Sequence, residues 1–160
     1  MNGWQIGCVN VRGWKTGKFV DLTEELHAWD FDVIGITQTC LRERVSFENE
    51  EYKMINKGRS KMTKAGGGVG MVFRKSLNMQ VDEINVGNSM MSEDIFAAKC
   101  EQKIGDTTEC LIVVVCYMTT EGADTAHDNA EKYDIVKRVL ESNRNSKVLV
   151  MGDVNGTLVH

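Results

Sequence analysis

The stretch LIVVVCY (Leu111–Tyr117) carries the clearest secondary-structure signal of this 160-residue chain. Its first six residues are apolar and four of them are Ile or Val, which predicts a strand covered on both faces. A helical pattern over Ala126–Asn143 follows, and KVLVM (Lys147–Met151) predicts the next strand. Strand, helix and strand at this spacing form a βαβ unit with parallel strands. The predicted apolar face of the helix is Ala126, Ala130, Tyr133, Val136, Val139 and Leu140.

The N-terminal part repeats this pattern. Trp4–Val11 alternates as a strand does, Lys18–Asp30 has the apolar stripe of an amphipathic helix, and DVIGIT (Asp32–Thr37) predicts a buried strand. No repeat, low-complexity tract or linker interrupts the chain, so we expect one domain over residues 1–160. The pattern therefore predicts an α/β or α+β architecture with a mixed sheet, of which we take α/β as the fold class. The remaining expected strands are Tyr52–Asn56, Val69–Arg74, Met79–Ile84 and Ile95–Gln102, the last joined to Glu109–Tyr117 by a turn at Gly105-Asp106.

Composition excludes several classes of protein. With 19 Lys and Arg against 23 Asp and Glu, the chain does not coat nucleic acid by bulk charge, so such a contact needs a local patch. No apolar run is long enough for a membrane span and no signal peptide is visible, so we expect no membrane partner. The five cysteines form no CxxC motif, which favours reduced thiols and an intracellular (cytoplasmic or nuclear) protein.

Polar residues follow each strand predicted to be central: Asn10, Gln38, Tyr117, and Asp153 with Asn155. If these strands run parallel, their carboxyl ends share one edge of the sheet, which is where α/β sheets bind ligands. Amide and carboxylate oxygens suit a hard cation such as Mg²⁺, and an Asp there can also serve as a general base. The alternative is that Asn and Asp only form turns where strands end.

A basic stretch runs from Lys53 to Lys75, with seven Lys or Arg residues and no acidic one. One interpretation of this stretch is a patch that contacts the phosphates of DNA. The alternative is a solvated loop. The Gly66–Gly70 sequence within it lacks the Lys-Ser/Thr of a P-loop and precedes a strand, which favours a flexible turn. The candidate phosphate contacts are Lys57, Arg59, Lys61 and Lys64.

Five blocks resemble the N-terminal part of the endonuclease/exonuclease/phosphatase superfamily, and most closely the endonuclease domains of non-LTR retrotransposons. They are IGCVNVRGW (Ile6–Trp14), DVIGITQTCLR (Asp32–Arg42), GGGVGMVFRKSL (Gly66–Leu77), LIVVVCY (Leu111–Tyr117) and VLVMGDVNG (Val148–Gly156). The resemblance implies an α/β sandwich of two packed sheets and phosphodiester hydrolysis with Mg²⁺ or Mn²⁺, typically nicking DNA. By position, Asn10 matches a residue that holds metal and phosphate, Tyr117 one that reaches the phosphate, Asp153 one that orients or deprotonates water, and Asn155 the Asn beside it.

Two departures from the family pattern imply weak or absent hydrolysis. The metal-binding glutamate of the family's ITET block is Gln38 here, which keeps an amide oxygen as a metal ligand but loses the charge. The family's C-terminal Asp–His motif has no counterpart, so the chain resembles a truncated member or a fragment. The alternative function is a non-enzymatic homodimeric binding or structural module derived from a retrotransposon endonuclease.

The homodimer expectation rests on burial. Leu111–Cys116, Val33–Ile36 and Val148–Met151 are predicted to be buried on both faces, whereas two helices cover about one face of a sheet. On the expectation that the second sheet belongs largely to the missing half, a second copy would complete the sandwich by packing sheet on sheet or by swapping strands.

Overall fold

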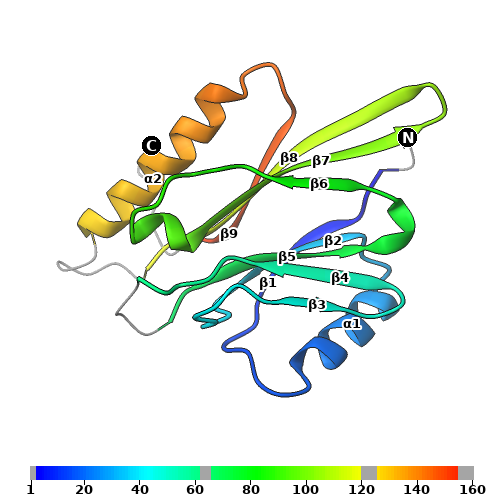
Figure 1. The fold of residues 1–160 in the computed structure, drawn as a ribbon, viewed down its shortest axis with the longest axis horizontal. Coiled ribbons are helices and arrows are strands. Elements are labelled where there is room, and N and C mark those ends of the chain that lie inside the picture. Colours follow the sequence, from blue (N-terminus) through cyan, green and yellow to red (C-terminus); the bar gives the residue numbers. More distant parts are fainter. Residues whose placement is uncertain (1–2, 62–65, 120–125, 155–160) are drawn as a thin grey trace.

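A computed structural model of the chain describes residues 3–61, 66–119 and 126–154. These residues form two sheets, each flanked by one α-helix (Figure 1). The first sheet has the strand order β1-β2-β5-β4-β3 and the second has the order β6-β7-β8-β9. The elements are β1 (Ile6–Asn10), α1 (Lys18–Ala28), β2 (Val33–Thr37), β3 (Ser46–Glu48), β4 (Tyr52–Asn56), β5 (Val69–Arg74), β6 (Gln80–Glu83), β7 (Ile95–Ile104), β8 (Thr107–Tyr117), α2 (Ala126–Ser142) and β9 (Val148–Asp153).

Three apolar clusters divide the molecule into four layers. Alternation along β8 sends Val113 and Val115 toward the first sheet, while Ile112 and Val114 face α2. On the far side, α1 buries Leu22 and its neighbours against the outer face of the first sheet. The fold is therefore a helix–sheet–sheet–helix sandwich, which confirms the α/β class and the two packed sheets (Figure 1).

Both sheets lie within this chain, so the expectation that the second sheet belongs largely to a missing half was wrong. Leu111 is partly exposed, but Ile112–Cys116 and the whole of β2 are buried on both faces, as predicted, because each faces a helix on one side and the opposite sheet on the other. The prediction for Val148–Met151 was wrong: β9 is an edge strand, and 40% of Val150 is exposed. A sheet-on-sheet dimer needed a sheet face that the single chain leaves uncovered. Because the two sheets of this chain cover each other, that reason for a dimer no longer holds.

The buried face of α2 also differs from the predicted one. Ala130, Tyr133 and Leu140 are exposed, although Val136 and Val139 are buried as expected. The helix is rotated because it buries Lys132, whose side chain is fully covered and paired with Asp94. The apolar pattern alone did not show that a lysine would face inward.

Strand directions place the carboxyl ends of four strands at one edge of the sandwich. β1 and β2 pair in parallel in the first sheet, and β8 and β9 pair in parallel in the second. The short strand β3 was not expected, because a three-residue edge strand leaves almost no sequence pattern. No helix in the described ranges is both long and apolar enough to cross a membrane.

Two of the five cysteines, Cys100 and Cys116, are buried as small apolar side chains. Burial raises the pKa of the Cys100 thiol to about 12 and that of the Cys116 thiol to about 11. Both thiols therefore stay protonated and unreactive near neutral pH.

Candidate functional site

Two hydrogen bonds connect the sheets at the edge where the parallel strands end. Asn10 Nδ2, from the end of β1, donates to Asp153 Oδ2, at the end of β9, over 2.8 Å. Gln38 Nε2, just after β2, donates to the Tyr117 hydroxyl, at the end of β8, over 3.2 Å. Four predicted site residues that lie far apart in the sequence thus form one cluster, which we call the edge site.

The edge site is held in a defined arrangement. The backbone N–H of Arg12 donates to Asn10 Oδ1 over 3.0 Å, so the Asn10 amide presents its nitrogen to Asp153. The backbone N–H of Met118 donates to the Asp153 carbonyl, which fixes the end of β9 against β8. Asn155, the fifth predicted residue, lies outside the described residues.

The glycine loop before β5 (residues 66–68) packs against the part of the edge site that carries Tyr117. Gly68 has a φ of +93°, and a Cβ there would lie 2.4 Å from the Thr39 hydroxyl, so only glycine fits. A Cβ at Gly66 would lie 3.7 Å from the Tyr117 hydroxyl. The Gly67 and Gly68 backbone is buried, so this part of the loop is a packed element and not the flexible turn that its composition favoured.

A buried ionic cluster centred on Asp94 holds the glycine loop in place. Asp94 accepts hydrogen bonds from Arg59 Nε at 2.8 Å, from Lys132 Nζ at 2.9 Å and from the Gly68 backbone N–H at 2.9 Å. Lys132 Nζ also donates to the Tyr117 carbonyl over 3.1 Å. One carboxylate therefore links the glycine loop to the backbone of Tyr117. Sequence reasoning missed Asp94 and Lys132, because a single charged residue just before β7 and another within α2 give no signal of burial.

The four residues that were predicted to contact phosphate differ in how far the structure buries them. Lys61 is exposed and Lys57 is half-buried. The assignment of Arg59 to the surface was wrong: its side chain is buried and pairs with Asp94. Lys64 lies outside the described residues.

The donor set of the edge site tests whether a divalent cation fits. Asp153 supplies one carboxylate, while Asn10 and Gln38 direct their amide nitrogens at Asp153 and Tyr117 and would have to turn their neutral amide oxygens toward a cation to ligate it. Among the described residues, no three His, Cys, Asp or Glu side chains gather into a metal-binding group. The oxygens suit a hard cation, but one negative charge holds such an ion only weakly.

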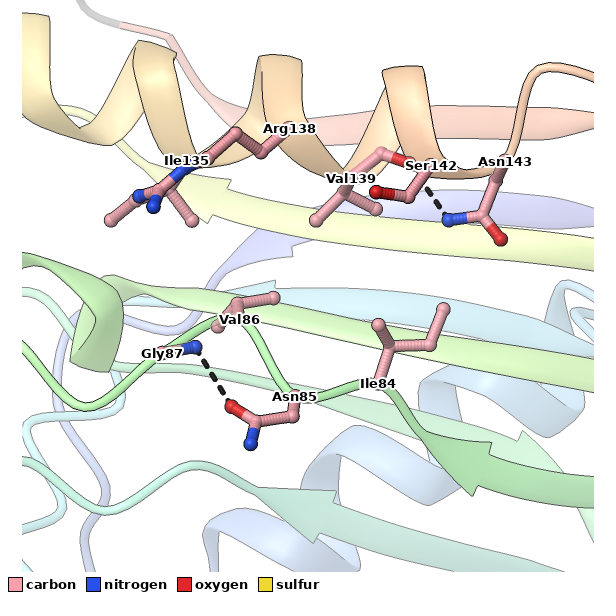
Figure 2. Close-up of a pocket in the computed structure, with 9 residues that line it drawn as sticks. All are labelled: Ile84, Asn85, Val86, Gly87, Ile135, Arg138, Val139, Ser142 and Asn143. Carbon is pink, nitrogen blue, oxygen red and sulfur yellow. Dashed lines mark hydrogen bonds between the residues drawn. The ribbon is translucent and has the colours of Figure 1, made fainter.

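Two further hollows differ in their relation to the edge site. One, of about 400 Å³, includes Asn10 in its lining, together with three cations (Arg12, Lys15 and Lys18) and two carboxylates (Asp21 and Glu25). The other, of about 270 Å³, lies between α2 and the segment after β6 (Figure 2). Its lining combines apolar side chains such as Ile84 and Val139 with Arg138, and it includes no carboxylate, His or Cys. It therefore lacks the acid–base groups that the edge site has.

No protein-family model and no curated protein matches the chain. Solved structures do match its fold. The endonuclease domain of TRAS1, a telomere-specific non-LTR retrotransposon, superposes with a TM-score of 0.65 at 11% identity over 97% of this chain and 62% of that chain. The AP endonuclease LMAP from Leishmania major gives 0.66 at 12% identity over 95% and 55%. The mannosyl-6-phosphatase Bt3783 from Bacteroides thetaiotaomicron gives 0.61 at 13% identity over 99% and 67%.

These matches share one architecture across nucleases and a phosphatase. The chain spans about three fifths of the length of solved structures such as the TRAS1 endonuclease domain and D. rerio TDP2. An endonuclease/exonuclease/phosphatase family protein from Bacteroides thetaiotaomicron is among them, with a TM-score of 0.60 at 12% identity over 98% of this chain. The chain has the endonuclease/exonuclease/phosphatase fold.

Proposed function

We propose that this chain is an endonuclease-like domain that binds DNA and hydrolyses its phosphodiesters weakly. The observation that carries the proposal is the edge site, where Asn10 and Asp153 meet at 2.8 Å across the two sheets. In an α/β fold, the carboxyl ends of parallel strands are the favoured place for a ligand. The matched nucleases and phosphatase make a phosphate ester the substrate class to test first.

The roles of the side chains follow from their chemistry. Asp153 Oδ2 is engaged by Asn10, and Oδ1 makes no hydrogen bond within the described part of the chain, so it is available to accept a proton from water as a general base. The Tyr117 hydroxyl, which accepts a hydrogen bond from Gln38, keeps its own proton to donate to a phosphate oxygen.

A divalent cation, Mg²⁺ or Mn²⁺, is the expected cofactor, and Asp153, Asn10 and Gln38 would hold it. When bound, such an ion polarises the phosphate and neutralises its developing charge. Because Gln38 is neutral, we expect binding only in the millimolar range, where low-charge oxygen sites lie.

Replacing Gln38 by glutamate should tighten Mg²⁺ binding by roughly tenfold or more, because the cation gains a second negative charge at close range. Isothermal titration calorimetry measures the affinity. Asn145→Asp, at an exposed position of the loop before β9, adds the same charge away from the edge site and is the matched control. Equal affinities for the wild-type protein and Gln38→Glu would remove Gln38 from the metal site.

A non-enzymatic module that binds a partner or nucleic acid is the second candidate function. The neutral Gln38 favours it, since hydrolysis in this arrangement relies on a cation that one carboxylate holds poorly. Conversion of supercoiled plasmid to nicked circles with Mg²⁺ or Mn²⁺ separates the two functions. Nicking that disappears in Asp153→Asn supports the enzyme, and DNA binding without any nicking supports the module.

A further inference from the structure

The side chain of Lys132 is fully buried at the end of β8, beside the Tyr117 of the edge site. Its Nζ donates to Asp94 Oδ2 at 2.9 Å, to the Tyr117 carbonyl at 3.1 Å and to the Thr119 hydroxyl at 3.2 Å. An ammonium group has three N–H donors, and here each of them has an acceptor. The position of this positive charge is therefore fixed.

The same ammonium lies over the aromatic ring of Tyr117, with Nζ 5.4 Å from the ring centroid. A cation at this distance from the face of a tyrosine ring is attracted to it, and the attraction grows when both groups are shielded from water. Only 7% of Tyr117 is exposed. Lys132 therefore holds Tyr117 in two places, at its carbonyl and at its ring.

The helix α2 brings a second side chain to the same segment. Asn129 precedes Lys132 by three residues and so lies on the same face of α2. Its Oδ1 accepts the Thr119 backbone N–H at 2.9 Å, and its Nδ2 donates to the Thr119 carbonyl at 2.8 Å. The chain that leaves β8 is therefore tied to α2 both at Tyr117 and at Thr119.

Asp94 also places a neighbour of the Tyr117 hydroxyl. The Gly68 backbone N–H donates to Asp94 Oδ1, and a Cβ at Gly67 would lie 2.7 Å from the same oxygen, so the glycine loop packs directly on this carboxylate. A Cβ at Gly66 in that loop would lie 3.7 Å from the Tyr117 hydroxyl. One buried carboxylate therefore holds both the loop beside the hydroxyl and the ammonium over the ring.

The Tyr117 hydroxyl itself has few direct contacts that fix it. Within the described part of the chain, its one hydrogen bond is the 3.2 Å bond from Gln38 Nε2. The place of the hydroxyl therefore depends on what packs against the ring and the backbone of Tyr117. A displacement of about 1 Å in a reacting group is enough to cost on the order of 10²-fold in rate.

We propose that Lys132, held by Asp94, is a positioning residue that keeps the Tyr117 hydroxyl at the edge site, a role that rests on the proposed function of that site. The hydroxyl would there donate to a phosphate oxygen. Lys132 is fully buried and so does not touch the substrate itself. Its whole effect on the edge site should therefore pass through Tyr117.

The first test follows the Gln38 side-chain amide by NMR, since Gln38 and Lys132 share no hydrogen bond within the described residues. Tyr117→Phe removes the hydroxyl and gives the signal of the Gln38 amide without its partner. Lys132→Met should move the signal toward that reference. Val139→Ala, at a buried position of the same helix, is the matched control and should leave the signal in place.

The same shift is expected in Lys132→Gln, which keeps a donor for Asp94 and serves where Lys132→Met does not fold. Three results would overturn the positioning role. The Gln38 signal could stay at its wild-type position in the Lys132 variants, it could move as far in Val139→Ala, or it could be unchanged in Tyr117→Phe.

The second test is a double-mutant cycle in plasmid nicking with Mn²⁺. Tyr117→Phe should slow nicking on the order of 10²-fold, as for the loss of one positioned hydrogen-bond donor. Lys132→Met should slow it about tenfold or more. The double variant should be no slower than Tyr117→Phe, because Lys132 acts through the hydroxyl. A double variant slowed by the product of the two single losses would make Lys132 a structural residue only and would overturn the positioning role.

The two tests together separate the positioning role from the hydrolase. If nicking depends on Asp153 while Lys132→Met nicks like the wild-type protein, the positioning role is wrong and the enzyme assignment stands. If neither the wild-type protein nor any variant nicks, and the Gln38 amide still moves in Lys132→Met, Lys132 positions Tyr117 and the hydrolase assignment is wrong.

Discussion

Replacing Asp94 by asparagine should destabilise the protein by about 3–5 kcal/mol, the usual cost of removing one partner from a buried ion pair. Asp94 is fully buried and accepts hydrogen bonds from Arg59 and Lys132, whose side chains are 5% and 0% exposed. The substitution leaves the Lys132 ammonium in the interior without its carboxylate. The melting temperature should fall by roughly 2–4 °C for each kcal/mol.

Lys132→Met should cost less, roughly 1–3 kcal/mol, because Asp94 keeps Arg59 while the Tyr117 carbonyl loses a donor. Lys137→Met, on an exposed position of the same helix, is the matched control and should stay within about 0.5 kcal/mol of the wild-type protein. Urea unfolding measures all three. An Asp94→Asn protein no less stable than Lys137→Met would show that the buried cluster contributes nothing.

Gly152→Ala should destabilise the protein by more than about 3 kcal/mol and should displace Asp153. Gly152 has a φ of +147°, and a Cβ there would lie 1.8 Å from the Cys116 carbonyl oxygen on the neighbouring strand. Backbone strain alone costs about 1–3 kcal/mol, and this clash adds to it because no side chain is able to move aside. The ends of β8 and β9 would have to separate at the point where they carry Tyr117 and Asp153.

Gly105→Ala is the control for this prediction. Gly105 also has a positive φ, of +60°, but a Cβ there meets nothing within 4 Å. It should therefore cost only the strain of the left-handed conformation, about 1–2 kcal/mol. Urea unfolding gives both stabilities, and the NMR signal of the Asn10 side-chain amide reports on the edge site. Equal losses for the two variants would mean that β8 and β9 are not packed as closely as the structure has them.

The edge site was predictable because it depends on strand direction and not on fine packing. Asn10, Gln38, Tyr117 and Asp153 each follow or end a strand that the sequence pattern predicts, and two βαβ patterns imply parallel pairs. The residues that end such strands must meet at one edge. What the pattern did not show is that they meet across two sheets, joined by the Asn10–Asp153 and Gln38–Tyr117 hydrogen bonds.

The sequence-based prediction was wrong about the burial of two charged residues. Arg59 was counted with the surface cations because of its neighbours in sequence, yet it is buried, since Asp94 from a distant segment supplies its counter-ion. The buried face of α2 was assigned wrongly for the same reason: Lys132 is buried because Asp94, from a distant segment, supplies its counter-ion.

The central claim is that the edge site is a metal-assisted phosphodiester site weakened by Gln38. It is tested most directly by plasmid nicking in Mn²⁺ or Mg²⁺ with the wild-type protein, Gln38→Glu and the double variant Gln38→Glu/Asp153→Asn. Gln38→Glu should nick faster than the wild-type protein, and loss of Asp153 should slow nicking on the order of 10²-fold or more, as for a lost general base. Nicking that Gln38→Glu does not increase, or that survives the loss of Asp153, would contradict the account.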